Sequence, residues 1–211
     1  MQLIQRFMRF FFHHFYHAFA WTYDFVAAVV SIGRWKDWIQ TVIPFIAGTR
    51  ILEIGHGPGH LQRILRTRGL LAVGLDESRQ MGFLAKRNTD GSARLTRGLA
   101  QALPFPSQMF DSVVSTFPSE YIFDPRTLSD VYRVLHRGGR FIILPAAWII
   151  GRASLDRVAA WLFRVTGETP ANVMDIMGKR AVRPLEKAGF KIETRQIEIA
   201  SSVVLIVIAS K

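Results

Sequence analysis

A short glycine-rich stretch is the part of this sequence best suited to hold a ligand. Residues 51–62 read ILEIGHGPGHLQ, an apolar run followed by a turn and the start of an amphipathic helix near His60. The turn carries glycine at alternate positions: Gly55, Gly57 and Gly59. Glycines let the chain turn sharply and let a ligand approach bare backbone, while the following helix N-terminus favours negative charge. The dinucleotide pattern GxGxxG requires glycine where His60 stands, so the spacing disfavours a dehydrogenase.

Metal and thiol chemistry are both disfavoured. His56 and His60 are four residues apart, but His56 lies in the predicted loop and no carboxylate completes a ligand set of usual spacing. We therefore expect no metal. The chain has no cysteine, which removes thiol nucleophiles, disulfides and cysteine metal sites, and favours a cytoplasmic location.

The elements around this loop predict an α/β fold. After Pro44, short apolar runs alternate with helical patterns, which is typical of a mostly parallel sheet with helices on both faces. The last two strands are separated by too few residues for a parallel crossover, so we expect an antiparallel hairpin. The seven predicted strands are Arg50–Ile54, Ala72–Leu75, Arg94–Gly98, Asp111–Thr116, Arg140–Leu144, Lys191–Ile199 and Ser202–Ala209.

Two further segments bear on the site. Arg126–Leu135 is predicted to be a helix that ends at Gly138 and Gly139, because glycine adopts the left-handed conformation of a helix C-cap at no steric cost. Residues 145–189 are longer than a plain crossover and hold two helical patterns, Ser154–Val165 and Asn172–Lys187. We expect this segment to cover the carboxyl edge of the sheet, where open α/β folds bind ligands.

The first 46 residues form a separate predicted segment, before a main domain at 47–211. The opening stretch is apolar and aromatic, but arginine and histidine interrupt it, so it predicts no transmembrane span. At helical spacing it predicts an amphipathic basic helix. Two interpretations remain open: residues 1–20 are a lid on the domain, or they contact an anionic membrane surface peripherally.

From about Thr49 to the C-terminus, the chain resembles the class I S-adenosylmethionine-dependent methyltransferases. The resemblance lies in the ExGxGxG pattern, in VGLDES at 73–78, in LAQALPFPSQMFDSVVSTF at 99–117 and in RVLHRGGRFIIL at 133–144. It implies a Rossmann-like fold, S-adenosylmethionine as cofactor and S-adenosylhomocysteine as product. In that family the acidic residue at Glu53 approaches the methionine amino end, and the one at Asp76 holds both ribose hydroxyls. The cofactor-binding residues implied are Glu53, Gly55, His56, Gly57, Gly59, Asp76, Glu77, Ser78, Met81, Ala100, Gln101, Thr116 and Phe117.

One position departs from the family pattern. Leu99 stands where many members carry an acidic residue that accepts from the adenine amino group. Ala100 and Gln101 would then make that contact through backbone groups or the Gln101 amide.

The acceptor is suggested by a shorter resemblance. TYDFVAAVVSIGRWKDWI at 22–39 is similar to the region before the first strand in ubiquinone/menaquinone C-methyltransferases, which implies a small lipophilic acceptor such as a quinol or isoprenoid-like molecule. A phospholipid headgroup N-methyltransferase would fit the same features. The candidate catalytic residues are Tyr23 and Asp24 before the domain, and Glu120 and Tyr121 after the fourth strand, where a carboxylate could take a proton and an aromatic ring could stack on the substrate.

Net charge leaves two other function classes open. The chain carries 27 Lys and Arg against 16 Asp and Glu, a formal charge of +11, which favours anionic partners. A nucleic-acid methyltransferase would suit this charge, but no RNA-binding module is recognisable and Thr116-Phe117-Pro118-Ser119 replaces the Asn-Pro-Pro-Tyr-like run, so nucleic acid is not the expected partner. A non-catalytic, membrane-associated cofactor-binding protein is the remaining alternative.

Overall fold

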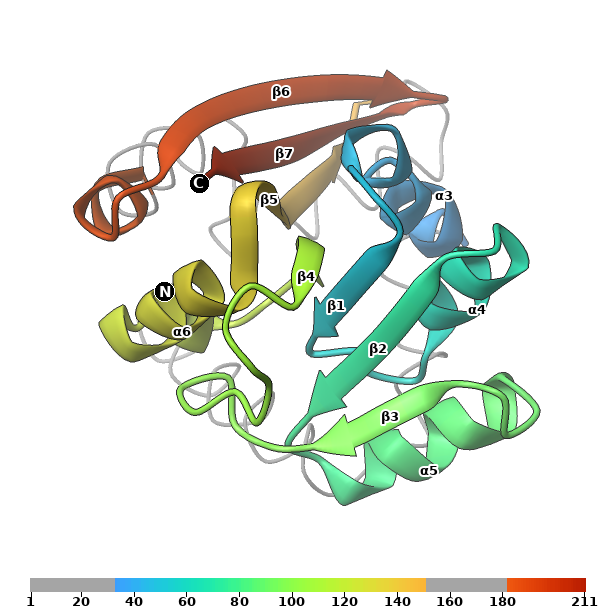
Figure 1. The fold of residues 1–211 in the computed structure, drawn as a ribbon. Coiled ribbons are helices and arrows are strands. Elements are labelled where there is room, and N and C mark those ends of the chain that lie inside the picture. The colour runs from blue at the N-terminus through green and yellow to red at the C-terminus, as the bar shows by residue number, and fades with distance from the viewer. Residues whose placement is uncertain (1–32, 151–181) are drawn as a thin grey trace, which may run out of the picture.

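A twisted sheet forms the centre of the molecule (Figure 1). The computed structural model describes residues 33–150 and 182–211. The strands lie in the order β3-β2-β1-β4-β5-β7-β6; β1 to β5 are parallel, and β7 runs antiparallel between β5 and β6. Their bounds are β1 Arg50–Ile54, β2 Leu71–Asp76, β3 Arg94–Arg97, β4 Phe110–Thr116, β5 Leu135–Ile149, β6 Lys191–Ile199 and β7 Ser202–Ser210.

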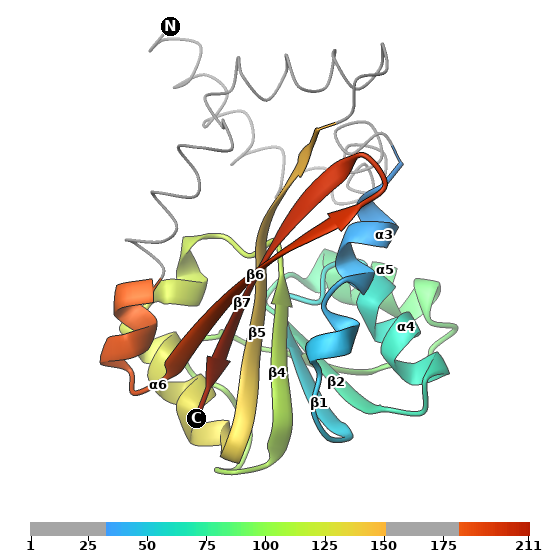
Figure 2. The ribbon, with the colours of Figure 1, turned by 90° about the horizontal axis from the view of Figure 1, so that it is seen from above.

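Helices cover both faces of the sheet. The view in Figure 2 shows α3, α4 and α5 on one face and α6 with the helix at 182–187 on the other. The bounds of the named helices are α3 Trp35–Gln40, α4 His60–Thr67, α5 Arg79–Asn88 and α6 Pro125–Val134, with single 3₁₀ turns η2 Ile43–Phe45 and η3 Glu120–Phe123. The predicted Rossmann-like fold with a terminal antiparallel hairpin is confirmed.

Each face of the sheet has its own hydrophobic cluster. Trp38 and Leu65 pack with Ile142 on the face covered by α3 and α4, and Leu128 and Phe141 belong to the cluster on the other face. In the central strands β1, β4 and β5, successive apolar residues belong to alternate clusters, as expected for parallel strands covered on both faces. This leaves the loops at the strand ends as the exposed part of the parallel sheet.

The end of α6 and the start of β5 differ from the prediction. The helix ends at Val134, and Leu135 is already extended and paired with Phe110, so neither glycine caps the helix. Gly138 instead lies inside β5 with φ +78, where the β4–β5 register shifts. Gly138 therefore adopts left-handed backbone at a β-bulge, which, like a helix C-cap, is a common place for glycine.

Strand β5 is also longer than predicted at its far end. It continues through Ile149 with a second register shift against β7, so residues 145–149 are strand and not part of a helical cover. The Ser154–Val165 pattern lies outside the described residues, and of the Asn172–Lys187 pattern only 182–187 is described, as helix. The segment 1–20 also lies outside them. Within the described ranges, no helix is long and apolar enough to cross a membrane.

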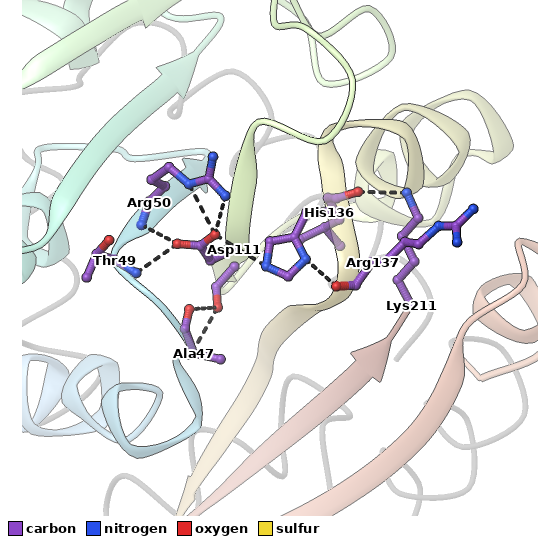
Figure 3. A network of polar contacts seen from close by, with 9 residues as sticks. Ala47, Thr49, Arg50, Asp111, His136, Arg137 and Lys211 are labelled. Atoms are coloured by element: carbon purple, nitrogen blue, oxygen red, sulfur yellow. Dashed lines mark hydrogen bonds and ion pairs between the residues drawn. The ribbon is translucent and has the colours of Figure 1, made fainter.

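Polar contacts at the amino edge of the sheet fix the segment before β1 to the start of β4 (Figure 3). The carboxylate of Asp111 accepts hydrogen bonds from the backbone N–H groups of Thr49 and Arg50 and from the Arg50 guanidinium, at 2.6–3.1 Å. Beside it, Ser112 Oγ accepts from Ala47 N and donates to Ala47 O. The bonds from Arg50 and Thr49 hold the pKa of Asp111 at about 2, and the Arg50 side chain is the largest cause.

Candidate functional site

The glycine loop lies at the carboxyl end of β1, where the sequence predicts it. The backbone N–H groups of Gly55 and His56 both donate to Leu75 O, which ties the turn to β2. Gly59 is the N-cap of α4 with φ +82, and a Cβ there would lie 2.9 Å from Ala85 Cβ in α5. Glycine is therefore required at 59 both by conformation and by the close approach of α5.

Gly57 presents bare backbone to open space. Its φ is +50, and nothing lies within 4 Å of the place where a Cβ would stand. Its N–H donates to Asp76 Oδ2 at 2.9 Å, which fixes the direction of the loop at this residue. The turn thus offers the uncovered backbone surface that a ligand lying across the loop would need.

Asp76 joins the loop to the start of α5. Its Oδ2 accepts from Gly57 N and its Oδ1 accepts from Ser78 N, each at 2.9 Å. A carboxylate has about four acceptor positions, and the described residues fill one on each Asp76 oxygen, so each oxygen can also accept from a hydroxyl donor. Ser78 caps α5 by accepting from Met81 N. Asp76 is therefore held in one orientation with capacity for a diol.

Glu53 is buried directly beneath the loop. Its side chain is 1% exposed, and its Oε2 accepts from Gln62 Nε2 at 2.8 Å. Burial raises the pKa of Glu53 to about 8; the bond from Gln62 opposes this rise and the charge of Asp76 adds to it. Gln62 Oε1 is also buried, and no described residue pairs with it. The loop thus rests on a buried polar pair, Glu53 and Gln62, that can take up a proton or accept a hydrogen bond from a further donor.

His56 supports the loop from within. It is buried, with Nδ1 2.7 Å from Gly57 O, and its ring lies against Gly74 of β2. Burial lowers its pKa, while the charge of Asp76 acts in the opposite direction. In the described ranges, no three His, Cys, Asp or Glu side chains gather in an arrangement that could hold a metal ion.

Known proteins share the fold of this chain, and one family model matches part of it. The family model described as methyltransferase domain matches residues 52–143, which contain the glycine loop, Asp76 and strands β2 to β4. Residues 52–143 are therefore similar to a methyltransferase domain. A structure of an S-adenosylmethionine-dependent methyltransferase from Archaeoglobus fulgidus covers 83% of this chain and 92% of its own, with a TM-score of 0.59 and 16% identity.

Two curated relatives are similar to part of this chain. Demethylmenaquinone methyltransferase from Symbiobacterium thermophilum is 34% identical over 137 residues, which are 59% of this chain and 55% of that protein. Ubiquinone/menaquinone biosynthesis C-methyltransferase UbiE from Geobacter sulfurreducens is 33% identical over 134 residues, 58% of this chain and 52% of that protein. The chain thus spans about half the length of these relatives.

The structure brings one predicted catalytic residue to the loop. Tyr121 in η3 is half-buried, and its hydroxyl lies 2.5 Å from the position of a Cβ on Gly55. Glu120 is exposed, and Ser115 is buried and donates to Ile54 O, so it joins β4 to β1. Of the four catalytic candidates, Tyr23 and Asp24 lie outside the described residues.

The remaining cofactor candidates divide by their surroundings. Thr116 and Gln101 are partly exposed, Glu77 is exposed, and Ala100 and Met81 are buried. The Gln101 side chain also hydrogen-bonds Asp124, the N-cap of α6, and contributes to the lowered pKa of that carboxyl, for which Arg126 is the largest cause.

Two residues at the edge of the site have other notable surroundings. Phe117 has φ +50, and its ring stacks on Trp35 of α3 with centroids 4.2 Å apart. Leu99, where the family often has an acid, is 53% exposed. The cofactor roles named from sequence stay predictions at all of these positions.

Sequence reasoning missed Gln62. It occupies a core position of α4, three residues before buried Leu65, and is itself fully buried. A polar residue on the apolar stripe of an otherwise regular amphipathic helix was the available signal, because such a side chain needs a buried partner. That partner is Glu53, the acidic residue of the motif.

Proposed function

We propose that this protein is an S-adenosylmethionine-dependent methyltransferase whose acceptor is a small lipophilic ring compound of the quinol type. One observation carries the cofactor part: the backbone N–H groups of Gly57 and Ser78 hold the Asp76 carboxylate, and among the described residues each oxygen has a further acceptor position for a hydroxyl. The family match over 52–143 supports the same assignment.

The chain's own residues fit this cofactor. Asp76 would accept both ribose hydroxyls, and the open backbone at Gly57 would let the ligand lie across the loop. Glu53, with Gln62, would face the methionine amino end from below. When bound, the cofactor supplies an electrophilic methyl group, and the protein's task is to align the acceptor in line with it and exclude water.

The acceptor part rests on the relatives and on the sequence. Curated relatives from four organisms, among them Thermobifida fusca and Thermus thermophilus, are named demethylmenaquinone methyltransferases. Tyr121, close to the loop, is the described residue best placed to orient an acceptor ring, and Tyr23 and Asp24 are proposed to complete the site. The phospholipid and nucleic-acid alternatives gain no support from the relatives.

Calorimetric titration with S-adenosylhomocysteine, with NADH as control, tests the cofactor part. We expect saturable binding of the first ligand alone. Methyl transfer to reduced demethylmenaquinone, compared with phosphatidylethanolamine and with RNA, tests the acceptor part. Binding without transfer to any quinol would overturn the acceptor assignment but leave the cofactor assignment standing, and binding of NADH alone would overturn both.

A further inference from the structure

Helix α5 has an exposed basic face that no element of residues 33–150 or 182–211 covers. Arg79, Phe83, Lys86 and Arg87 follow the spacing i, i+4, i+7, i+8, which places them on one side of the helix, and all four are exposed. The opposite side, with Met81 and Ala85, is buried against the domain. We call these four residues the α5 basic face.

An exposed aromatic ring lies within this face. Phe83 is 61% exposed, more than the other large apolar side chains of the described ranges, and the Arg79 guanidinium lies over its ring at 5.5 Å from the centroid. The segment Arg79–Asn88 contains no acidic residue. A single exposed apolar side chain is common. The combination of this ring with three cations on one helix face, however, suits an external partner that is both apolar and anionic.

The neighbouring strand extends the charge. β3 is the edge strand of the sheet beside α5, as Figure 1 shows, and it begins and ends with exposed Arg94 and Arg97. Arg97 Nε donates to Glu77 O, which fixes this cation beside the start of α5. The face begins three residues after Asp76, so it adjoins the edge of the sheet that holds the proposed cofactor site.

We propose that the α5 basic face is a docking surface for an anionic phospholipid bilayer. Basic side chains beside an aromatic ring suit the interface of such a bilayer, where cations meet headgroup phosphates and the ring enters the acyl boundary. The choice of a bilayer over a nucleic acid rests on the proposed function, because a quinol-type acceptor is dissolved in the membrane.

Vesicle cosedimentation tests this surface. Full-length protein is mixed with phosphatidylcholine vesicles with and without phosphatidylglycerol, and we expect binding that requires the anionic lipid. Neutralising one basic residue near the surface weakens binding by about fivefold, so Lys86→Gln/Arg87→Gln should weaken it on the order of 20-fold. Phe83→Gln should weaken it further, because the apolar contact is lost.

The matched control removes the same two charges elsewhere. Arg183→Gln/Lys187→Gln changes exposed residues of the helix at 182–187, on the other face of the sheet, and should leave most vesicle binding intact. Equal losses in both double variants, or no vesicle binding by the parent, would overturn the proposal. The proposal would also be overturned if Lys86→Gln/Arg87→Gln weakened binding to an RNA oligonucleotide but not to the vesicles. Each variant is also titrated with S-adenosylhomocysteine. A variant that loses vesicle binding but still binds this ligand shows a defect of the surface and not a failure of the proposed function.

Discussion

At the scale of single residues, Asp76 is the side chain on which the cofactor assignment depends. Asp76→Asn keeps one acceptor oxygen and the shape of the side chain but loses the charge. Since hydrogen bonds to a charged group contribute about 1.5–3 kcal/mol each, we expect S-adenosylhomocysteine to bind about 10–100-fold more weakly. Calorimetry measures this directly. Asp90→Asn, an exposed residue after α5, serves as control, and equal affinities in the two variants would contradict the role of Asp76.

Glu53 gives the fold a pH dependence of its own. Its folded-state pKa of about 8 lies above the unfolded value, so between those two values the folded protein holds a proton that the unfolded chain releases. The contribution of this group to stability is therefore present below the unfolded pKa and falls as pH rises through about 8. The full loss is at most on the order of a few kcal/mol.

Glu53→Gln should remove this dependence. A glutamine can accept from Gln62 Nε2 and donate to the buried Gln62 Oε1, so the variant should fold. Melting temperatures of the ligand-free proteins are measured from about pH 5 to about pH 9. The melting temperature of the variant should increase relative to that of the parent as pH rises. Parallel curves over that range would show that Glu53 does not carry the proton.

At the scale of elements, the approach of α5 to the glycine loop is the critical packing contact. In Gly59→Ala the new Cβ would stand 2.9 Å from Ala85 Cβ and 3.0 Å from Ala85 Cα, so the loop or α5 must move. We expect at least a tenfold loss of S-adenosylhomocysteine affinity, because the loop carries the open backbone. Gly69→Ala is the control, because Gly69 has φ +75 and nothing lies within 4 Å of the place where its Cβ would stand. This variant has the energetic cost of left-handed backbone but makes no close contact. Equal affinity losses would mean that the contact is irrelevant.

The polar anchor before β1 should stabilise the whole sheet through one carboxylate. Asp111→Ala removes the acceptor of two backbone bonds, each contributing about 1 kcal/mol, which predicts a melting temperature lower by roughly 4–8 °C at neutral pH. Because its folded pKa is depressed to about 2, this contribution is present above the unfolded pKa and disappears as pH falls. The difference between variant and parent should narrow toward pH 2, and a constant difference would refute the assignment.

At the scale of the whole molecule, the sequence predicts what depends on local pattern. The pattern of residues and turns predicts all seven strands, and the predicted bounds of β1 and β6 agree with the structure at both ends. For β1, burial on both faces makes the apolar run distinctive. The predicted helix C-cap at Gly138 and Gly139 is wrong, since a glycine with left-handed backbone, such as Gly138, serves equally in a helix cap and in a β-bulge. The predicted positions of the motif glycines and Asp76 agree with the structure, because the strand before each of them fixes where it lies.

What the sequence could not predict depends on contacts across the fold. Gln62 bonds Glu53 only because the loop brings α4 back over β1, and Asp111 meets Arg50 across 61 residues of chain. The placement of Tyr121 above Gly55 likewise follows from the adjacency of β1 and β4. Such pairs follow from topology and register, which no local periodicity encodes.

Charge is the remaining property of the whole molecule, and it should make stability depend on salt. With 27 basic and 16 acidic residues, self-repulsion opposes the compact state at neutral pH. Ion pairs such as Arg126–Asp124 and Arg195–Glu193 are exposed and contribute little. Raising NaCl from about 0.01 M to about 0.15 M shortens the screening length from about 30 Å to about 8 Å, so the melting temperature at pH 7 should rise. The rise should vanish near the isoelectric pH of 10.8. A fall at pH 7 would show that local pairs outweigh the net charge.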